Sequence, residues 1–152
     1  MGNNYKTINI VNVTNKLLRN IQIFWSLFIG IGAYSGAFMM IAYPSGIFGM
    51  DEMLPDMQKL PFAEILFQSL LFPGIALLII NGFTNTISFI LIFRRSKYAA
   101  SSGMICGIIL MLWITVQFYI FPFNFMSTLY FVFGFLQAVN GFMYLKQWKI
   151  KN

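Results

Sequence analysis

The sequence predicts an all-α membrane protein, a bundle of four transmembrane helices in a single domain. The first observation is composition: 59% of the 152 residues are hydrophobic, only 9% are charged, and the mean hydropathy is +0.74, which is not typical of a soluble globular chain. The second is that the apolar residues form long continuous runs, without the alternation of β-barrel strands. The third is that the charged residues flank these runs.

The charges are divided between the two sides of the expected membrane. All four acidic residues lie between Asp51 and Glu64, together with Lys59. The other basic residues form three groups beside the apolar runs: Lys6, Lys16 and Arg19; Arg94, Arg95 and Lys97; Lys146, Lys149 and Lys151. Because basic residues gather on the cytoplasmic side, we expect a multi-pass protein of the cell membrane with both termini cytoplasmic. This topology explains the net charge of +6, and nucleic acid is not expected as a partner.

The N-terminal segment, residues 1–19, is polar and rich in Asn. It is expected to lie in the cytoplasm, either as an amphipathic helix on the membrane surface or as a loosely ordered tail. A cleaved signal peptide is a weaker interpretation, because the following apolar run continues to Tyr43. The transmembrane domain is expected to cover residues 20–146, and residues 147–152 form a cytoplasmic tail.

The first transmembrane helix is expected over about 21–43. Ser26 and Gly30, and then Gly32 and Gly36, place small residues four positions apart, a spacing that lets a neighbouring helix approach closely. The external loop, residues 44–64, contains three prolines that prevent a long helix. It is unusually apolar, so we expect a short turn near 50–54 and a loop that folds back onto the membrane interface.

The second helix is expected over about 64–93, with Pro73 and Gly74 inside it. No charged residue occurs from Tyr98 to Leu145, a stretch too long for one helix, and the segment 121–124 contains a proline that divides it. The third and fourth helices are therefore expected over about 99–121 and 126–146. A weak similarity between the first and second halves of the chain suggests two parallel helical hairpins.

Five amide side chains lie within the expected membrane segments: Asn81, Asn85, Gln117, Gln137 and Asn140. Gly74, Asn81, Asn85 and Ser88 are spaced by seven, four and three residues, so they share one face of the second helix. An amide facing lipid is costly, so Asn81 and Asn85 should face the interior, with Gln137 and Asn140 as partners. The amides are either interhelical hydrogen-bonding groups or the lining of a ligand cavity.

The residue inventory excludes several kinds of chemistry. The chain has no histidine and one cysteine, Cys106, so histidine-ligated metals and a thiol–imidazole pair are excluded within one chain. We expect no catalytic residues, no metal and no cofactor. Gly103 and Gly107 form a second small-residue seam, on the third helix. The absence of Asp, Glu, Lys and Arg within the membrane argues against a proton-coupled transporter.

Several short motifs carry a resemblance: Tyr43-Pro44-Ser45-Gly46, Gly49-Met50, Pro61-Phe62, Phe72-Pro73-Gly74 and the stretch 107–117. With these, most of residues 20–145 resembles small bacterial four-helix membrane proteins of uncharacterised function, and the general plan is similar to DoxX-type four-helix proteins. The resemblance implies a four-helix fold and a bacterial source, but no activity. Catalytic residues of redox relatives are not carried over, because a cysteine pair is absent.

These observations favour a non-enzymatic membrane protein that binds a lipid-like or hydrophobic ligand or a membrane partner. The alternative is a small transporter or channel for a neutral or hydrophobic solute, formed by oligomerisation through the glycine faces. A membrane enzyme that acts on lipid is the weakest hypothesis, for want of an acid–base pair. The expected partners are membrane lipids and either further copies of the chain or another membrane protein.

Overall fold

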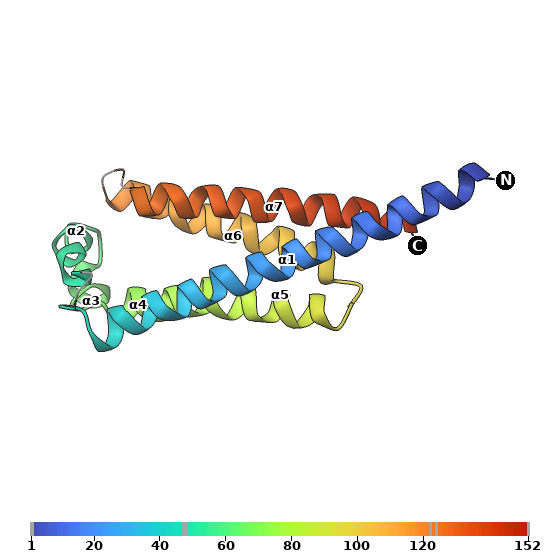
Figure 1. Ribbon diagram of the computed structural model, residues 1–152. Coiled ribbons are helices and arrows are strands. Elements are labelled where there is room, and N and C mark those ends of the chain that lie inside the picture. Colours follow the sequence, from blue (N-terminus) through green and yellow to red (C-terminus); the bar gives the residue numbers. More distant parts are fainter. Residues whose placement is uncertain (1, 47–48, 122, 124, 152) are drawn as a thin grey trace.

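The computed structural model describes residues 2–46, 49–121, 123 and 125–151, with side chains described between residues 12 and 148. This part of the chain is helical, without strands, and forms four long rods (Figure 1). The rods are α1 (Gly2–Ala42); α4 (Leu71–Leu77), the π-helical segment η2 (Leu78–Phe83) and α5 (Thr84–Phe93) in line; α6 (Ala99–Ile120); and α7 (Phe125–Lys151). An all-α four-helix bundle, as predicted, is confirmed.

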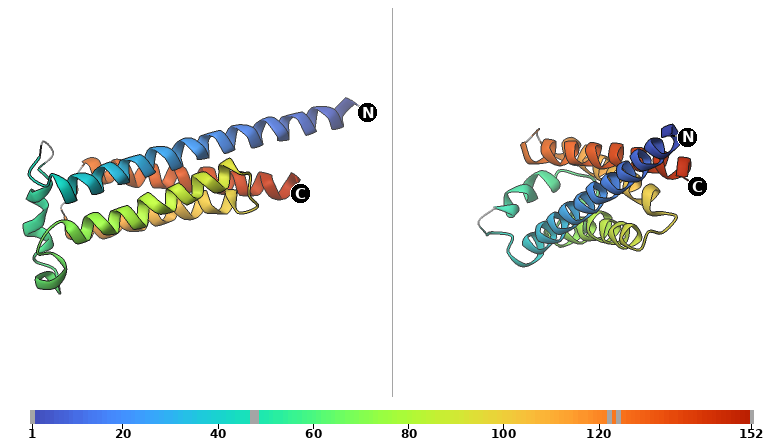
Figure 2. Two further views of the ribbon diagram at one scale, coloured as in Figure 1. Left: turned by 90° about the horizontal axis from the view of Figure 1, so that it is seen from below. Right: turned by 45° about the vertical axis from the view of Figure 1, so that its right-hand side comes forward.

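The rods alternate in direction along the bundle. α1 packs against the α4–α5 rod on one side and against α7 on the other, while α6 packs against α7 and α5 (Figure 2). Within the described residues, four stretches are long and apolar enough to cross a membrane: Asn12–Ala42, Leu71–Phe93, Ala99–Ile120 and Phe125–Trp148. The protein is therefore a polytopic membrane protein.

The distribution of side chains matches a bundle surrounded by lipid. Large apolar side chains point outward along every rod, among them Ile31, Ile79, Leu112 and Phe135. Polar side chains, in contrast, are buried between the rods. This arrangement is the reverse of a soluble protein, and it is expected where the surrounding solvent is as apolar as the side chains themselves.

Glycines set the close approach of α6 and α7. A Cβ atom at Gly107 would lie 2.5 Å from the Gly134 carbonyl oxygen and 2.8 Å from the Ala138 Cα. One at Gly141 would lie 2.7 Å from the Met104 Cα. Because these neighbours are backbone atoms, no side-chain rotation relieves the contact, and only glycine permits this spacing.

α1 is longer than the predicted first helix. It runs without a break from Gly2, so residues 2–19 and the membrane-crossing part form one helix of 41 residues. At 1.5 Å per residue, about 60 Å of helix exceeds an apolar layer of about 30 Å, and the beginning of α1 projects beyond the bundle (Figure 2). The side chains of residues 1–11 lie outside the description, so an amphipathic surface helix there stays a prediction.

The second rod begins at Leu71, and the predicted beginning at Glu64 is wrong. The short helix α3 (Ala63–Leu66) ends at Phe67, whose φ of −121° and ψ of 35° are not helical. The rod then begins with Pro73 in its first turn. A proline is favourable there, because its missing N–H group needs no partner in the first turn of a helix. Pro73 therefore begins the rod and does not interrupt it.

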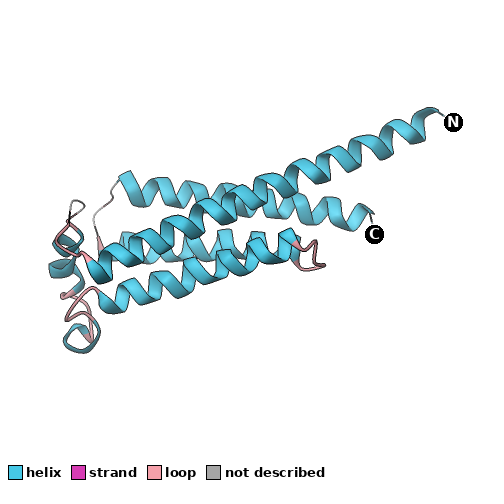
Figure 3. Cartoon of the chain, turned by 60° about the horizontal axis from the view of Figure 1, so that its bottom comes forward, coloured by secondary structure: helices cyan, strands magenta, loops and turns pink. Residues whose placement is uncertain are grey.

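The segment predicted to be the external loop folds over one end of the bundle (Figure 3). It contains the short helices η1 (Met50–Met53) and α2 (Leu54–Met57), where a turn was predicted. Met57 is buried together with Met40 of α1 and Leu70, so the loop covers the ends of the rods. We call this end of the molecule the loop end and the opposite end, which carries the three basic groups, the basic end.

Candidate functional site

A layer of polar side chains lies buried between the four rods. Its members are less than 9% exposed and come from α1, the second rod and α7: Gln22, Ser26, Asn81, Asn85, Ser88, Gln137 and Asn140. Asn81, Asn85, Gln137 and Asn140 are four of the five predicted amides. Burial of an amide stabilises only when it finds a hydrogen-bond partner, so the pairing of these groups decides what the layer does.

Two hydrogen bonds between amide side chains of different helices hold the layer together. The Gln137 Nε2 donates to the Asn85 Oδ1 at 2.8 Å, which joins α7 to α5. The Asn140 Nδ2 donates to the Gln22 Oε1 at 2.6 Å and to the Leu18 carbonyl at 3.1 Å, which joins α7 to α1. The geometry thus brings Asn85 and Gln137 together, while Asn140 bonds to α1 and to neither Asn81 nor Asn85.

Serines extend the layer toward α6. The Ser26 Oγ donates to the Ser88 Oγ at 3.3 Å, and Ser88 and Ser102 lie 3.2 Å apart between their hydroxyl oxygens. Cys106 lies beside them, buried, with its Sγ donating to the Thr84 carbonyl at 3.4 Å. Its surroundings are those of a packed core thiol and provide no base to activate it.

The middle of the second rod departs from α-helical geometry. In η2 the backbone widens to a π-helix, and such segments are rare and occur often at functional sites. Three side chains after it donate to its backbone carbonyls: Thr84 to Ile80 at 2.6 Å, Asn85 to Asn81 at 2.9 Å and Thr86 to Gly82 at 3.0 Å. These bonds supply partners for carbonyl groups near the distortion, in an apolar medium that offers none.

Asn81 lies within this distorted segment and differs from the other amides. Its side chain is only 1% exposed, yet neither its Nδ2 nor its Oδ1 has a hydrogen-bond partner among the described residues. Leaving both groups unpaired costs about 1–3 kcal/mol each. Such a group calls for an explanation, and the cavity beside it provides one.

A cavity of about 400 Å³ opens toward the loop end, and we call it the loop-end cavity. Its walls come from α1, the second rod, α6, α7 and the loop. Most of the lining is apolar, from residues such as Ile29, Met40, Leu77, Leu110 and Ile114. Among the described residues of the lining there is no charged side chain, so a neutral occupant fits its chemistry.

The residues with polar side chains that line this cavity are Ser35, Asn81, Trp113, Gln117, Ser127 and Tyr130. The amide atoms of Asn81 and the indole Nε1–H of Trp113 are buried with no hydrogen-bond partner among the described residues. The Gln117 Oε1 accepts from the Ser127 Oγ at 3.3 Å. A mostly apolar cavity with a small number of convergent polar groups is the usual form of a small-molecule site.

The predicted glycines lie in different surroundings. Gly32 and Gly36 line the loop-end cavity, where a Cβ at Gly32 would lie 2.8 Å from the Tyr130 hydroxyl and one at Gly36 would lie 3.2 Å from Leu77. Gly103 lies under the side chain of Gln22, which fills the space of a Cβ. Only Gly107 of the four lies against the backbone of a neighbouring helix.

Sequence reasoning missed Gln22 and the polar role of Ser26. Gln22, Ser26 and Gly30 recur at intervals of four on α1, and all three are buried. This spacing was a usable signal, since it puts a glutamine on the same face as the small residues. The unpaired indole of Trp113 had no comparable signal, because its pairing depends on the contacts between helices.

The described side chains of the site can bind a ligand through hydrogen bonds, but few of them are of the kinds that catalyse reactions. Among the residues that the structure describes, no group of three or more His, Cys, Asp or Glu side chains lies close enough to hold a metal ion. Its polar groups are amides, hydroxyls and an indole, which donate and accept hydrogen bonds without changing charge at ordinary pH. Comparisons with protein-family models, curated proteins and solved structures found no match to this chain.

Proposed function

We propose that the protein is a non-enzymatic, multi-pass protein of a bacterial cell membrane that binds a neutral, lipid-like ligand in the loop-end cavity. The observation that carries this proposal is the side chain of Asn81, which is buried, unpaired among the described residues and located on the cavity wall. A ligand that bonds to it removes the cost of two unpaired groups. The resemblance to small bacterial four-helix proteins is consistent with this location.

The polar groups define the chemistry of the ligand. Trp113 can only donate, whereas the Asn81 amide can both donate and accept. A hydroxyl group on the ligand can accept from one of these donors and donate to the Asn81 Oδ1, whereas a carbonyl group can only accept. An aliphatic or ring body fills the apolar walls. The absence of charge in the lining disfavours a carboxylate or an amine, because a charge in such a cavity would lack a counter-ion.

Two substitutions separate ligand binding from helix packing. Asn81→Leu removes an amide that has no side-chain partner, so the fold should hold while the bound molecule is lost. Asn140→Leu is the matched control, because it removes another buried amide, one that makes two hydrogen bonds and does not line the cavity. This control should lower stability by about 1 kcal/mol and keep the ligand.

Native mass spectrometry of the purified protein measures the bound molecules, and a melting curve in the same detergent measures stability. We expect a co-purifying neutral species on the wild-type protein and on Asn140→Leu but not on Asn81→Leu. Equal occupancy on Asn81→Leu, together with a lower melting temperature, would show that Asn81 contributes to packing and would refute the ligand site.

A small oligomeric transporter or channel is the second candidate, and one observation favours it. The buried amides lead from the loop-end cavity toward the basic end, through Asn85 and Gln137 to Asn140 and Gln22. A neutral solute crossing the bundle needs polar groups along such a row. Flux of a neutral solute into proteoliposomes, reduced by Asn85→Leu, would support this function over simple binding.

A further inference from the structure

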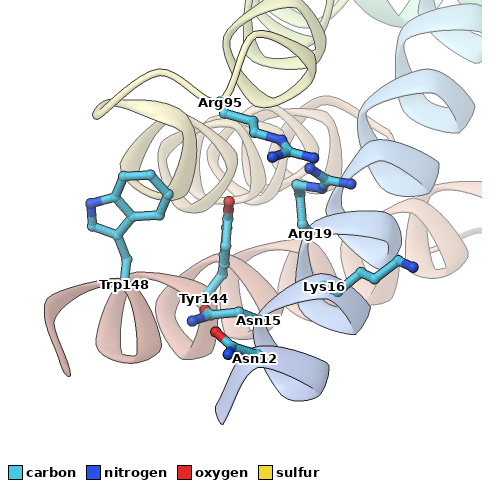
Figure 4. A pocket seen from close by; sticks show the side chains of 7 residues that line it. All are labelled: Asn12, Asn15, Lys16, Arg19, Arg95, Tyr144 and Trp148. Carbon is cyan, nitrogen blue, oxygen red and sulfur yellow. The ribbon is translucent and has the colours of Figure 1, made fainter. Parts of the chain in front are cut away.

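A second cavity, of about 440 Å³, opens at the basic end, and we call it the basic-end cleft (Figure 4). It lies where the early part of α1, the turn between α5 and α6, and the end of α7 meet. The lining side chains are Asn12, Asn15, Lys16 and Arg19 of α1, Arg95 of the turn, and Tyr144 and Trp148 of α7. This lining is polar and cationic, unlike that of the loop-end cavity.

The cations of this cleft have no acidic side chain to balance them. The sequence places every Asp and Glu between residues 51 and 64, in the segment that covers the opposite end of the bundle. The ion pair found within the described residues, Lys59 with Asp56 at 2.6 Å, belongs to that segment as well. The positive charge of Lys16, Arg19 and Arg95 is therefore uncompensated by carboxylate side chains.

The cationic side chains of Arg19 and Arg95 lie close together in the cleft. In Figure 4 the guanidinium groups of Arg19 and Arg95 point toward each other, and the Tyr144 hydroxyl points toward the same space. The Nε of Arg19 and both amide atoms of Asn15 are buried without a hydrogen-bond partner among the described residues. Two facing guanidinium groups repel each other. The unpaired donors among these atoms, the Arg19 Nε and the Asn15 Nδ2, are groups that an anion would bind.

We propose that the basic-end cleft binds a phosphate group, held between Arg19 and Arg95 with Lys16 and the amide of Asn15 beside it. Guanidinium groups match phosphate oxygens in geometry, because each presents several N–H donors in one plane. A phosphate has more acceptor oxygens than a carboxylate, so it can bond to donors that converge from two helices and a turn. The Tyr144 hydroxyl can donate to the same group.

The head group of an anionic phospholipid is the source that the position of the cleft favours. The cleft lies at the ends of membrane-spanning helices, and basic pockets between such helices bind anionic head groups on the cytoplasmic side. Trp148 lines the cleft on α7, and tryptophan is enriched at the level of the head groups. A soluble phosphate has the same chemistry, so the experiment must separate the two sources.

The test uses the full-length protein in a zwitterionic detergent and measures apparent affinity by native mass spectrometry. The probes are phosphatidylglycerol, phosphatidylcholine and inorganic phosphate. The variants are Arg19→Gln, Arg95→Gln and the double variant. Arg94→Gln is the matched control, since Arg94 is the neighbouring residue in the same turn and does not line the cleft.

We expect the wild-type protein and Arg94→Gln to bind phosphatidylglycerol, and each cleft variant to lose about tenfold in affinity, the value of one charge-assisted hydrogen bond. Removal of one guanidinium group should also raise the melting temperature without lipid, which separates lost binding from lost folding. Binding of inorganic phosphate as tight as that of phosphatidylglycerol would keep the phosphate site and assign it to a soluble anion. Equal phosphatidylglycerol binding by wild type and the double variant, or an equal loss in Arg94→Gln, would overturn the proposal.

Discussion

The bond between Gln137 and Asn85 predicts an unequal pair of substitutions. Gln137→Met removes the donor to the Asn85 Oδ1, but it also removes the Gln137 Oε1, which has no partner among the described residues. The two effects partly offset each other, and we expect a loss of about 1 kcal/mol in the free energy of unfolding. Asn85→Leu leaves Gln137 with neither amide atom bonded, and it removes the bond to the Asn81 carbonyl. We expect a loss of about 2 kcal/mol there.

The double variant tests whether Gln137 and Asn85 stabilise the protein through their hydrogen bond or contribute independently. With both amides gone, no group of the pair is left unpaired, so the double variant should be about as stable as Asn85→Leu alone. This corresponds to a coupling energy of about 1 kcal/mol, within the range of interhelical hydrogen bonds in membranes. Reversible unfolding in mixed micelles, followed by circular dichroism, measures all four proteins. Additive losses, about 3 kcal/mol in the double variant, would refute the reasoning.

Three further predictions follow from the packing and the charge distribution. Gly107→Ala places a Cβ against backbone atoms of α7 and should lower the free energy of unfolding by about 1–3 kcal/mol. In Gly30→Ala the new Cβ lies 3.5 Å from the Asn85 Cβ, so this variant should be neutral or stabilising by about 0.5–1 kcal/mol. Similar melting temperatures for both variants would contradict the close contact between α6 and α7. Gly36→Leu should reduce the occupancy of the loop-end cavity in native mass spectra, and unchanged occupancy would place the ligand elsewhere. Ser45→Cys in a Cys106→Ala background should react with an impermeant thiol reagent on intact cells, and a reaction that needs permeabilised cells would reverse the topology.

The four rods of this bundle could be predicted from the sequence because each depends on the residues of its own segment. Length and apolar composition decide that a segment crosses a membrane, and the end of α6 at Ile120 follows from the proline two residues later. The beginning of the second rod at Leu71 was mispredicted because the uncharged run begins at Ile65, and no charged residue marks a boundary before the rod. There the position of Pro73 within the first turn, and not hydropathy, determines where the helix begins.

The candidate site could be predicted only in part. Helical spacing placed Asn81 and Asn85 on one face, and both are buried. The spacing could not choose partners, since α1 also carries a buried amide, Gln22, at the level of Asn140. Nor could it show that the Asn81 amide, in the π-helical segment η2 beside a cavity, would lack a partner while the Asn85 amide bonds to the Asn81 backbone carbonyl. Partner choice depends on the relative rotation of helices, which no local pattern encodes.

The loop-end cavity and the basic-end cleft have different linings, and imperfect helix packing alone does not explain this difference. A packing defect between apolar helices would be lined at random by the residues available, with its polar groups paired elsewhere. Here the loop-end cavity has no charge and contains an unpaired amide and an unpaired indole N–H among the described residues. The basic-end cleft collects three cations with no acidic side chain near them. Each cavity thus retains the polar groups that folding usually satisfies, and each set matches one chemistry, a neutral polar group in the apolar interior and a phosphate at the level of the head groups.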